Sequence, residues 1–306
     1  MQKKLNKSMY LLGFILTIAS FLNFLYAQEE KPIVVQDVLK RPHSFTRPVT
    51  RIVSLSPAVT ETLYAIGAGT TLVGNTTYCT YPEAALEVQK VGGYSADTIS
   101  VERIIQQQPE LVIGEISMHR SLENTLKEAA IHFFLVDITR IEDIYTLIQN
   151  LALITGRSSE GQGLIKNLQE RVNRITTIVA KKKTPRPRVF WEVWNEPLMT
   201  CGPHTFIGQI LSLAGAQNIF SDLSENWPIV SSEMVLVRNP DYIMSTRSHG
   251  EAMNLETLKR RPGWANLSAV RNRKIILFDD DIVSRPGPRF VEAVELVAKA
   301  LHPELF

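Results

Sequence analysis

The feature that most constrains this chain is a long amphipathic segment at its centre. Apolar side chains recur every three or four positions between about Ser158 and Lys182, separated by charged or amide side chains. The recurring residues are Leu164, Leu168, Val172, Ile175 and Val179. This period predicts one α-helix, roughly 35 to 40 Å long at 1.5 Å per residue. The prolines at 185 and 187 end it, so we expect a helix that joins two lobes.

Short β-branched runs alternate with helical stretches on both sides of this segment. The runs cover 51–55, 111–113, 132–136, 188–193, 242–244 and 274–278. Such alternation is typical of α/β proteins, and a chain of this length exceeds what one core usually holds. We therefore expect two Rossmann-like α/β lobes joined by one long rigid helix. The predicted units are an N-terminal lobe over 28–157, a connecting helix over 158–184 and a C-terminal lobe over 185–306.

The two halves carry similar local signals. Leu111 follows Gln-Pro-Glu and Tyr242 follows Asn-Pro-Asp, and each begins a predicted strand. Ser56 and Pro57 predict the cap and first turn of a helix that ends near Gly67. Residues 28–50, with three prolines, are expected to form an extended lead-in.

The N-terminal residues have the layout of a signal peptide. Three lysines precede a mostly apolar stretch over 10–26, and Ala27 closes it before polar and acidic residues. We predict a signal peptide over 1–27 and a periplasmic location, with an uncleaved anchor as the alternative. Without that segment the chain carries 30 basic and 31 acidic side chains. This balance gives no reason to expect nucleic acid or an anionic membrane surface as a partner.

Five stretches along the chain, in order, match a known protein family. They are Arg51-Ile-Val-Ser-Leu-Ser-Pro-Ala-Val-Thr-Glu61, Tyr78-Cys-Thr-Tyr-Pro82, Lys90-Val-Gly-Gly-Tyr94 with Val101-Glu-Arg-Ile104, Asn226-Trp-Pro-Ile-Val-Ser231 with Glu233, and Arg261-Pro-Gly-Trp264. On these residues the chain resembles the helical-backbone class of periplasmic binding proteins for iron-siderophores, haem and cobalamin, and within it the cobalamin-binding members. The resemblance implies a non-enzymatic, monomeric protein that captures cobalamin between its lobes and delivers it to an ABC permease with its ATPase. It implies no cofactor and no metal site of the protein's own.

The resemblance also assigns ligand-binding residues. Aromatic rings suit a flat macrocycle because they bury a large apolar area with little loss of rotamer entropy. The residues that fall at ligand-binding positions are Tyr78, Tyr94, Trp227, Asp281 and Arg285. Val193 stands where an aromatic residue is expected, and its neighbours Trp191 and Trp194 are expected to compensate.

Each assignment has a structural alternative. The isolated aromatic residues could belong to the core, and Asp281 could be part of a solvated acidic turn with Asp279 and Asp280. Arg285 could pair with Asp281. If both instead face the ligand, a carboxylate and a guanidinium fork suit the amide side chains of a corrin.

Two glutamates are predicted to contact the permease. Glu102 follows the expected helix cap Ser100 by two residues, and Glu233 follows Ser232 directly. Glutamates at the equivalent positions of the resembling proteins, one in each lobe, dock into arginine pockets. A carboxylate at an exposed helix start is a directional partner for a guanidinium. Stabilisation of the helix dipole is the alternative role.

Other readings remain open. Trp191-Glu-Val-Trp-Asn-Glu-Pro197 resembles the acid/base motif of barrel glycosidases and makes Glu196 a candidate catalytic acid. The central helix, however, interrupts the eight βα units that such a barrel requires. A ferric siderophore or haem, bound through Arg247, His249 or Tyr78, is the alternative ligand.

The remaining metal-binding side chains form no motif. His119, His204 and His249 are not grouped by spacing and are interpreted as lone surface histidines, with the alternative that one of them approaches the cleft as a metal ligand. Cys79 and Cys201 are expected to form one disulfide or to remain two isolated buried thiols.

Overall fold

The computed structural model describes residues 32–182, 184–248 and 253–306. The predicted signal peptide over 1–27 and His249 lie outside these ranges. None of the helices within them has both the length and the apolar composition needed to cross a lipid bilayer. We use N-terminal lobe for the residues before 158 and C-terminal lobe for those after 184; these boundaries themselves stay predictions.

The N-terminal lobe contains a five-stranded parallel sheet in the order β5-β4-β3-β6-β7. Its strands are β3 (Ile52–Ser54), β4 (Leu72–Thr76), β5 (Lys90–Gly92), β6 (Leu111–Glu115) and β7 (His132–Val136). Its helices are α2 (Pro57–Ala65), α3 (Val101–Gln106), α4 (Ile116–His119), α5 (Glu123–Glu128) and α6 (Ile141–Ile154). The central strands are almost wholly buried, as in sheets covered on both faces.

The C-terminal lobe repeats this arrangement. Strands β8 (Arg188–Asn195), β10 (Gln217–Asn218), β11 (Tyr242–Thr246) and β12 (Ile275–Phe278) form a parallel sheet in the order β10-β8-β11-β12. Strand β9 (Leu198–Thr200) turns back on β8 as an antiparallel hairpin. The helices are α8 (Phe206–Leu213), α9 (Ser232–Arg238), α10 (Leu255–Arg260), α11 (Ser268–Arg271), α12 (Asp280–Val283) and α13 (Phe290–Leu301).

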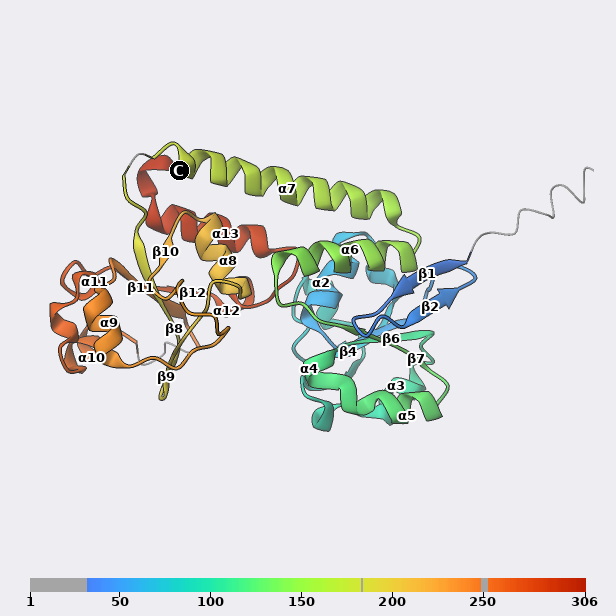
Figure 1. The fold of residues 1–306 in the computed structure, drawn as a ribbon. Helices are drawn as coiled ribbons and strands as arrows, with labels where there is room; N and C mark the ends of the chain where they lie inside the picture. The colour runs from blue at the N-terminus through green and yellow to red at the C-terminus, as the bar shows by residue number, and fades with distance from the viewer. Residues whose placement is uncertain (1–31, 183, 249–252) are drawn as a thin grey trace, which may run out of the picture.

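The predicted central helix is α7 (Ser158–Ala180), and it runs along one side of both lobes (Figure 1). It packs on α6 of the N-terminal lobe and on α13 and α8 of the C-terminal lobe. Leu168 and Ile175 on its predicted apolar face are buried. They join one hydrophobic cluster that contains Val59 from one lobe and Val294 from the other. The two lobes therefore share a continuous core beneath α7.

The lead-in to the first lobe is more ordered than expected. Strands β1 (Ile33–Gln36) and β2 (Pro42–Phe45) form an antiparallel hairpin. Val35 and Phe45 are buried in the shared core, which fixes the hairpin against the lobe. Pro42 is tolerated because it begins a strand in a two-stranded sheet.

Candidate functional site

A cleft of about 300 Å³ lies between the two lobes. Both sheets direct the carboxyl ends of parallel strands toward it, where ligands of open α/β sheets usually bind. Glu115 ends β6 and Thr246 ends β11, for example. The residues lining the cleft are Tyr94, Glu115, Ile138, Thr139, Trp191, Val193, His204, Thr205, Phe206, Ile207, Asn226, Trp227, Thr246, Ser284 and Pro286.

The wall from the N-terminal lobe is built on hydrogen bonds. The Tyr94 hydroxyl donates to the Glu115 carboxylate at 2.8 Å, and the Ser56 hydroxyl donates to the other carboxylate oxygen. Burial, followed by the nearby Glu115 charge, raises the pKa of Tyr94 well above its usual value. The phenol is therefore held neutral as a donor. Ser56 is also the N-cap residue of α2. Its hydroxyl donates to Glu115 and makes no capping hydrogen bond to the helix.

His119 fixes the position of Tyr94 from behind. Its Nε2–H donates to the Tyr94 carbonyl at 2.7 Å, and its Nδ1 accepts from the Glu115 N–H at 2.9 Å. The ring is fully buried, and this burial lowers the pKa of His119. The expectation of a surface histidine was therefore wrong: both ring nitrogens of this neutral side chain bond to backbone groups.

The wall from the C-terminal lobe is mainly aromatic and aliphatic. Alternation along β8 places Trp191 and Val193 on the cleft side. Trp191 is buried and stacks on Phe278, with ring centroids 5.8 Å apart. Glu192 points to the other face of the sheet, where it pairs with Arg261. Trp194 lies two residues after Glu192 and is not among the lining residues of the cleft.

Two loops of this lobe are tied together at the cleft. The Gly202 N–H donates to the Asn226 carbonyl at 2.7 Å, and the Thr200 N–H donates to the Pro228 carbonyl at 3.1 Å. A Cβ atom at Gly202 would lie 2.0 Å from the Glu225 carbonyl oxygen, so only glycine permits this approach. The indole of Trp227, 47% exposed, is thereby held on the cleft.

At the rim, the predicted polar residues already have partners. Asp281 and Arg285 form an ion pair at 2.6 Å. Arg285 Nη1 also donates to the Thr80 hydroxyl at 3.0 Å, which links the C-terminal lobe to the N-terminal lobe. Both lie beside the cleft-lining residues Ser284 and Pro286.

A buried ion pair joins the lobes behind this rim. Glu61 on α2 accepts two hydrogen bonds from Arg289, at 2.8 and 2.7 Å. The side chains are 3% and 15% exposed. The Arg289 guanidinium also lies over the ring of Tyr81, 4.0 Å from its centroid. This pair fixes the C-terminal lobe to the N-terminal lobe at the base of α13.

The structure thus gathers most, though not all, of the predicted ligand residues. Tyr94, Trp191 and Trp227 line the cleft, whereas Tyr78 lies beside it with its ring 5.7 Å from that of Tyr94. The sequence interpretation missed Glu115, Phe206 and several hydroxyl groups. The Thr246 hydroxyl is buried without a hydrogen-bond partner in the part of the chain described.

The two predicted docking glutamates occupy equivalent positions. Ser100 caps α3 and Ser231 caps α9, so that each glutamate is the second residue of its helix. The cap of α9 is therefore one residue earlier than Ser232. Both glutamates are exposed, and bonds to their own backbone N–H groups and to the cap serines lower the pKa of each carboxyl. They are ionised at neutral pH.

The described residues contain no group of three or more His, Cys, Asp or Glu side chains that could hold a metal ion. Cys79 and Cys201 are both free and buried. Each is enclosed in its own lobe, so the alternative of two isolated thiols applies.

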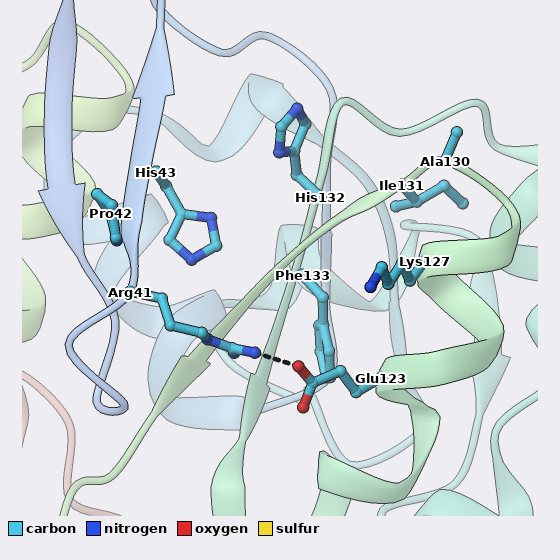
Figure 2. A pocket seen from close by; sticks show the side chains of 9 residues that line it. All are labelled: Arg41, Pro42, His43, Glu123, Lys127, Ala130, Ile131, His132 and Phe133. Carbon is cyan, nitrogen blue, oxygen red and sulfur yellow. Dashed lines mark hydrogen bonds and ion pairs between the residues drawn. The ribbon is translucent and has the colours of Figure 1, made fainter.

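Another cavity, of about 420 Å³, lies between the β1–β2 hairpin, β7 and α5 (Figure 2). Arg41 pairs there with Glu123, and His43, Lys127 and His132 complete its polar lining. It contains none of the predicted ligand residues and lies at the end of the N-terminal lobe away from the C-terminal lobe (Figure 1).

Two α/β lobes, one long helix and an interlobe cleft define a helical-backbone solute-binding protein. The family model described as periplasmic binding protein matches residues 52–282. The chain therefore belongs to the periplasmic binding protein family. Its fold and family are those of the substrate-binding proteins of ABC transporters, whose partners are a membrane permease and its ATPase.

Individual relatives agree with this assignment. The uncharacterized ABC transporter substrate-binding lipoprotein YvrC of Bacillus subtilis is 30% identical over 90% of this chain and 87% of its own length. The periplasmic vitamin B12 binding protein BtuF of Vibrio cholerae is 29% identical, with a TM-score of 0.69 over 84% of this chain and 98% of that one. A possible iron-binding, periplasmic solute-binding protein from Staphylococcus epidermidis is 28% identical, with a TM-score of 0.75 over 84% and 100%.

The fold also tests the hypothesis that Glu196 is the catalytic acid of a barrel glycosidase. Glu196 is exposed in the turn between β8 and β9. The strands described here form separate sheets rather than one ring of eight βα units. Its Asn-Glu-Pro sequence is therefore part of a hairpin turn and not the acid site of a barrel.

Proposed function

We propose that this chain is an extracytoplasmic binding protein that captures cobalamin in the interlobe cleft and delivers it to an ABC importer. The observation that carries the proposal is the charge of the cleft. Its described lining includes the carboxylate of Glu115 but no lysine or arginine. A corrin presents neutral amides around its ring, whereas haem carries two carboxylates and many ferric siderophores are anionic. An anion beside Glu115 would be repelled.

The neutral polar groups of the cleft support the same ligand. Asn226, Thr139, Ser284 and the unpaired Thr246 hydroxyl are donors and acceptors without charge, which suit amide groups. Trp227 and the apolar residues beside it offer a surface for a macrocycle. The BtuF relative is named as a vitamin B12 binding protein, in agreement with this choice.

The proposal is tested by titrating the purified protein, without residues 1–27, with cyanocobalamin, haemin and a ferric siderophore. We expect saturable one-to-one binding of cyanocobalamin, measured by calorimetry and by visible absorbance. Haemin should bind more weakly than cyanocobalamin. The Glu115→Gln variant keeps a side chain able to accept the Tyr94 hydrogen bond, and in this variant the difference in affinity between the two ligands should be smaller. Saturable binding of haemin or of the siderophore without binding of cyanocobalamin would overturn the proposal.

Delivery is proposed to use Glu102 and Glu233. Each carboxylate stands beside an exposed apolar side chain on its helix, Ile105 on α3 and Val237 on α9. A guanidinium of the permease would form a charge-assisted hydrogen bond with each carboxylate, one in each lobe. The matched control is Glu160, which is also an exposed glutamate in the first turn of a helix, α7.

The double variant Glu102→Ala with Glu233→Ala should bind cyanocobalamin as the wild type does, but support at most about a tenth of its uptake rate in reconstituted vesicles. The Glu160→Ala variant should transport normally. Uptake by the double variant at the wild-type rate would exclude the docking role.

A further inference from the structure

Three side chains in the described lining of the cleft belong to classes that commonly bind metals: a phenol, a carboxylate and an imidazole. They are Tyr94, Glu115 and His204. Tyr94 and Glu115 are already bonded to each other at 2.8 Å, and Glu115 also accepts from Ser56. Neither can turn to a ligand without breaking that network. The imidazole of His204 is the remaining candidate.

His204 is placed to meet a ligand. It is exposed and lines the cleft. No hydrogen bond or ion pair connects its side chain to another residue of the described ranges. It therefore differs from His119, whose two nitrogens are both occupied by backbone groups.

The loop that carries His204 is held on both sides. Thr205 caps α8, accepting from the Gly208 N–H at 3.0 Å and donating to the Gly202 carbonyl at 2.8 Å. Gly202 in turn is bonded to the Asn226 carbonyl, next to Trp227. The imidazole and the indole consequently stand on two loops that cannot move independently. Such fixed placement is what a metal ligand requires, because coordination is directional.

We propose that His204 supplies an axial nitrogen to the cobalt of a bound corrinoid whose axial position holds exchangeable water. The neutral imidazole donates its lone pair to cobalt(III), and the water molecule leaves with its own electron pair. No electron or proton is transferred. This inference rests on the proposed function, and it narrows the preferred ligand to corrinoids that are not already blocked by a strong axial group such as cyanide.

Aquocobalamin and cyanocobalamin are the two probes. Binding to the wild-type protein should shift the visible bands of aquocobalamin to those of its complex with free imidazole, while the bands of cyanocobalamin stay unchanged. In the His204→Ala and His204→Gln variants the shift should disappear. Affinity for aquocobalamin should then fall about tenfold, and affinity for cyanocobalamin should fall by a smaller factor. Far-ultraviolet circular dichroism and urea unfolding that match the wild type show that the variants are folded.

The matched control is His132→Ala, which removes an exposed histidine from the other cavity (Figure 2) and should leave the shift intact. If the wild-type protein binds aquocobalamin without the imidazole-type spectrum, or if the shift persists in both His204 variants, the inference is wrong and the proposed function stands. If neither corrinoid binds, the proposed function fails and this inference fails with it.

Discussion

The two lobes share a strand order but offer different surfaces to the cleft. The order β4-β3-β6-β7 in the first corresponds to β10-β8-β11-β12 in the second. The N-terminal wall is a hydrogen-bonded set centred on Glu115, whereas the C-terminal wall consists largely of Trp191, Phe206 and Trp227. The difference shows that one architecture can supply a polar edge on one side of a ligand and an apolar face on the other.

The two lobes are alike, in contrast, at the exposed starts of α3 and α9. Ser100 and Ser231 cap helices in the same way, and a glutamate follows each cap at the same distance. If Glu102 and Glu233 are the docking residues, a partner would meet the same local geometry on both lobes, whereas the cargo would meet two different walls.

The largest effect is expected at the joint between the lobes. Replacing Arg289 with Ala removes both short hydrogen bonds to the buried Glu61 carboxylate and leaves it only the Arg285 guanidinium, 3.9 Å away. Removing one member of a buried pair typically costs about 3 kcal/mol. We expect the free energy of unfolding in urea to fall by this amount.

The control for this variant is an exposed ion pair on α7. Lys166 and Glu170 are 3.9 Å apart, with side chains 79% and 65% exposed. Lys166→Ala should therefore change the free energy of unfolding by less than about 0.5 kcal/mol. Equal losses in the two variants would mean that the lobes do not depend on the buried pair.

The next effect concerns the two exposed tryptophans of the C-terminal lobe. Trp227 lines the cleft and Trp194 does not, although they are 47% and 50% exposed. Trp227→Ala should weaken cyanocobalamin binding by about 2 kcal/mol, or roughly 30-fold, because it removes a central aromatic contact. Trp194→Ala should change the calorimetric affinity less than about twofold. A larger loss of affinity in Trp194→Ala than in Trp227→Ala would place the ligand outside this cleft.

The smallest effect is expected in the hydrogen-bonded wall. Tyr94→Phe removes the donor to Glu115 and should lower the free energy of unfolding at pH 7 by about 1 kcal/mol. Tyr78→Phe, at a half-exposed ring beside it, should have no measurable effect.

The effect of Tyr94→Phe on the free energy of unfolding should depend on pH. Burial and Glu115 raise the pKa of Tyr94 in the folded protein. Its contribution is therefore complete below the unfolded-state value of about 10 and is lost as the pH rises above it. The difference in unfolding free energy between wild type and Tyr94→Phe should narrow above pH 10. A difference that stays constant up to pH 11 would contradict this account.

Much of the fold could be predicted because its signals are local. The apolar period of 158–182 predicted α7, which ends at Ala180. The six predicted strands all exist, and β7 has the bounds expected for it. The β1–β2 hairpin was missed because its prolines and short strands resemble an irregular lead-in.

The site was less accessible to sequence reasoning because its contacts are distant along the chain. Trp194 was expected to compensate for Val193, which stands where an aromatic residue is expected. Strand β8 instead continues to Asn195 with an irregular register against β9 between Glu192 and Trp194, and Trp194 is not among the lining residues of the cleft. The burial of His119 depends on the carbonyl of Tyr94, 25 residues away, and nothing near His119 signals it.

The two thiols give the molecule a property of practical use. Cys79 and Cys201 are each sealed inside a lobe, and burial raises the pKa of Cys201 to about 12. The fold described here is complete without a covalent bond between the two sulfur atoms. Cysteines engineered on the surface of either lobe would be the reactive ones, which makes the chain suitable for site-specific attachment of a pair of fluorophores.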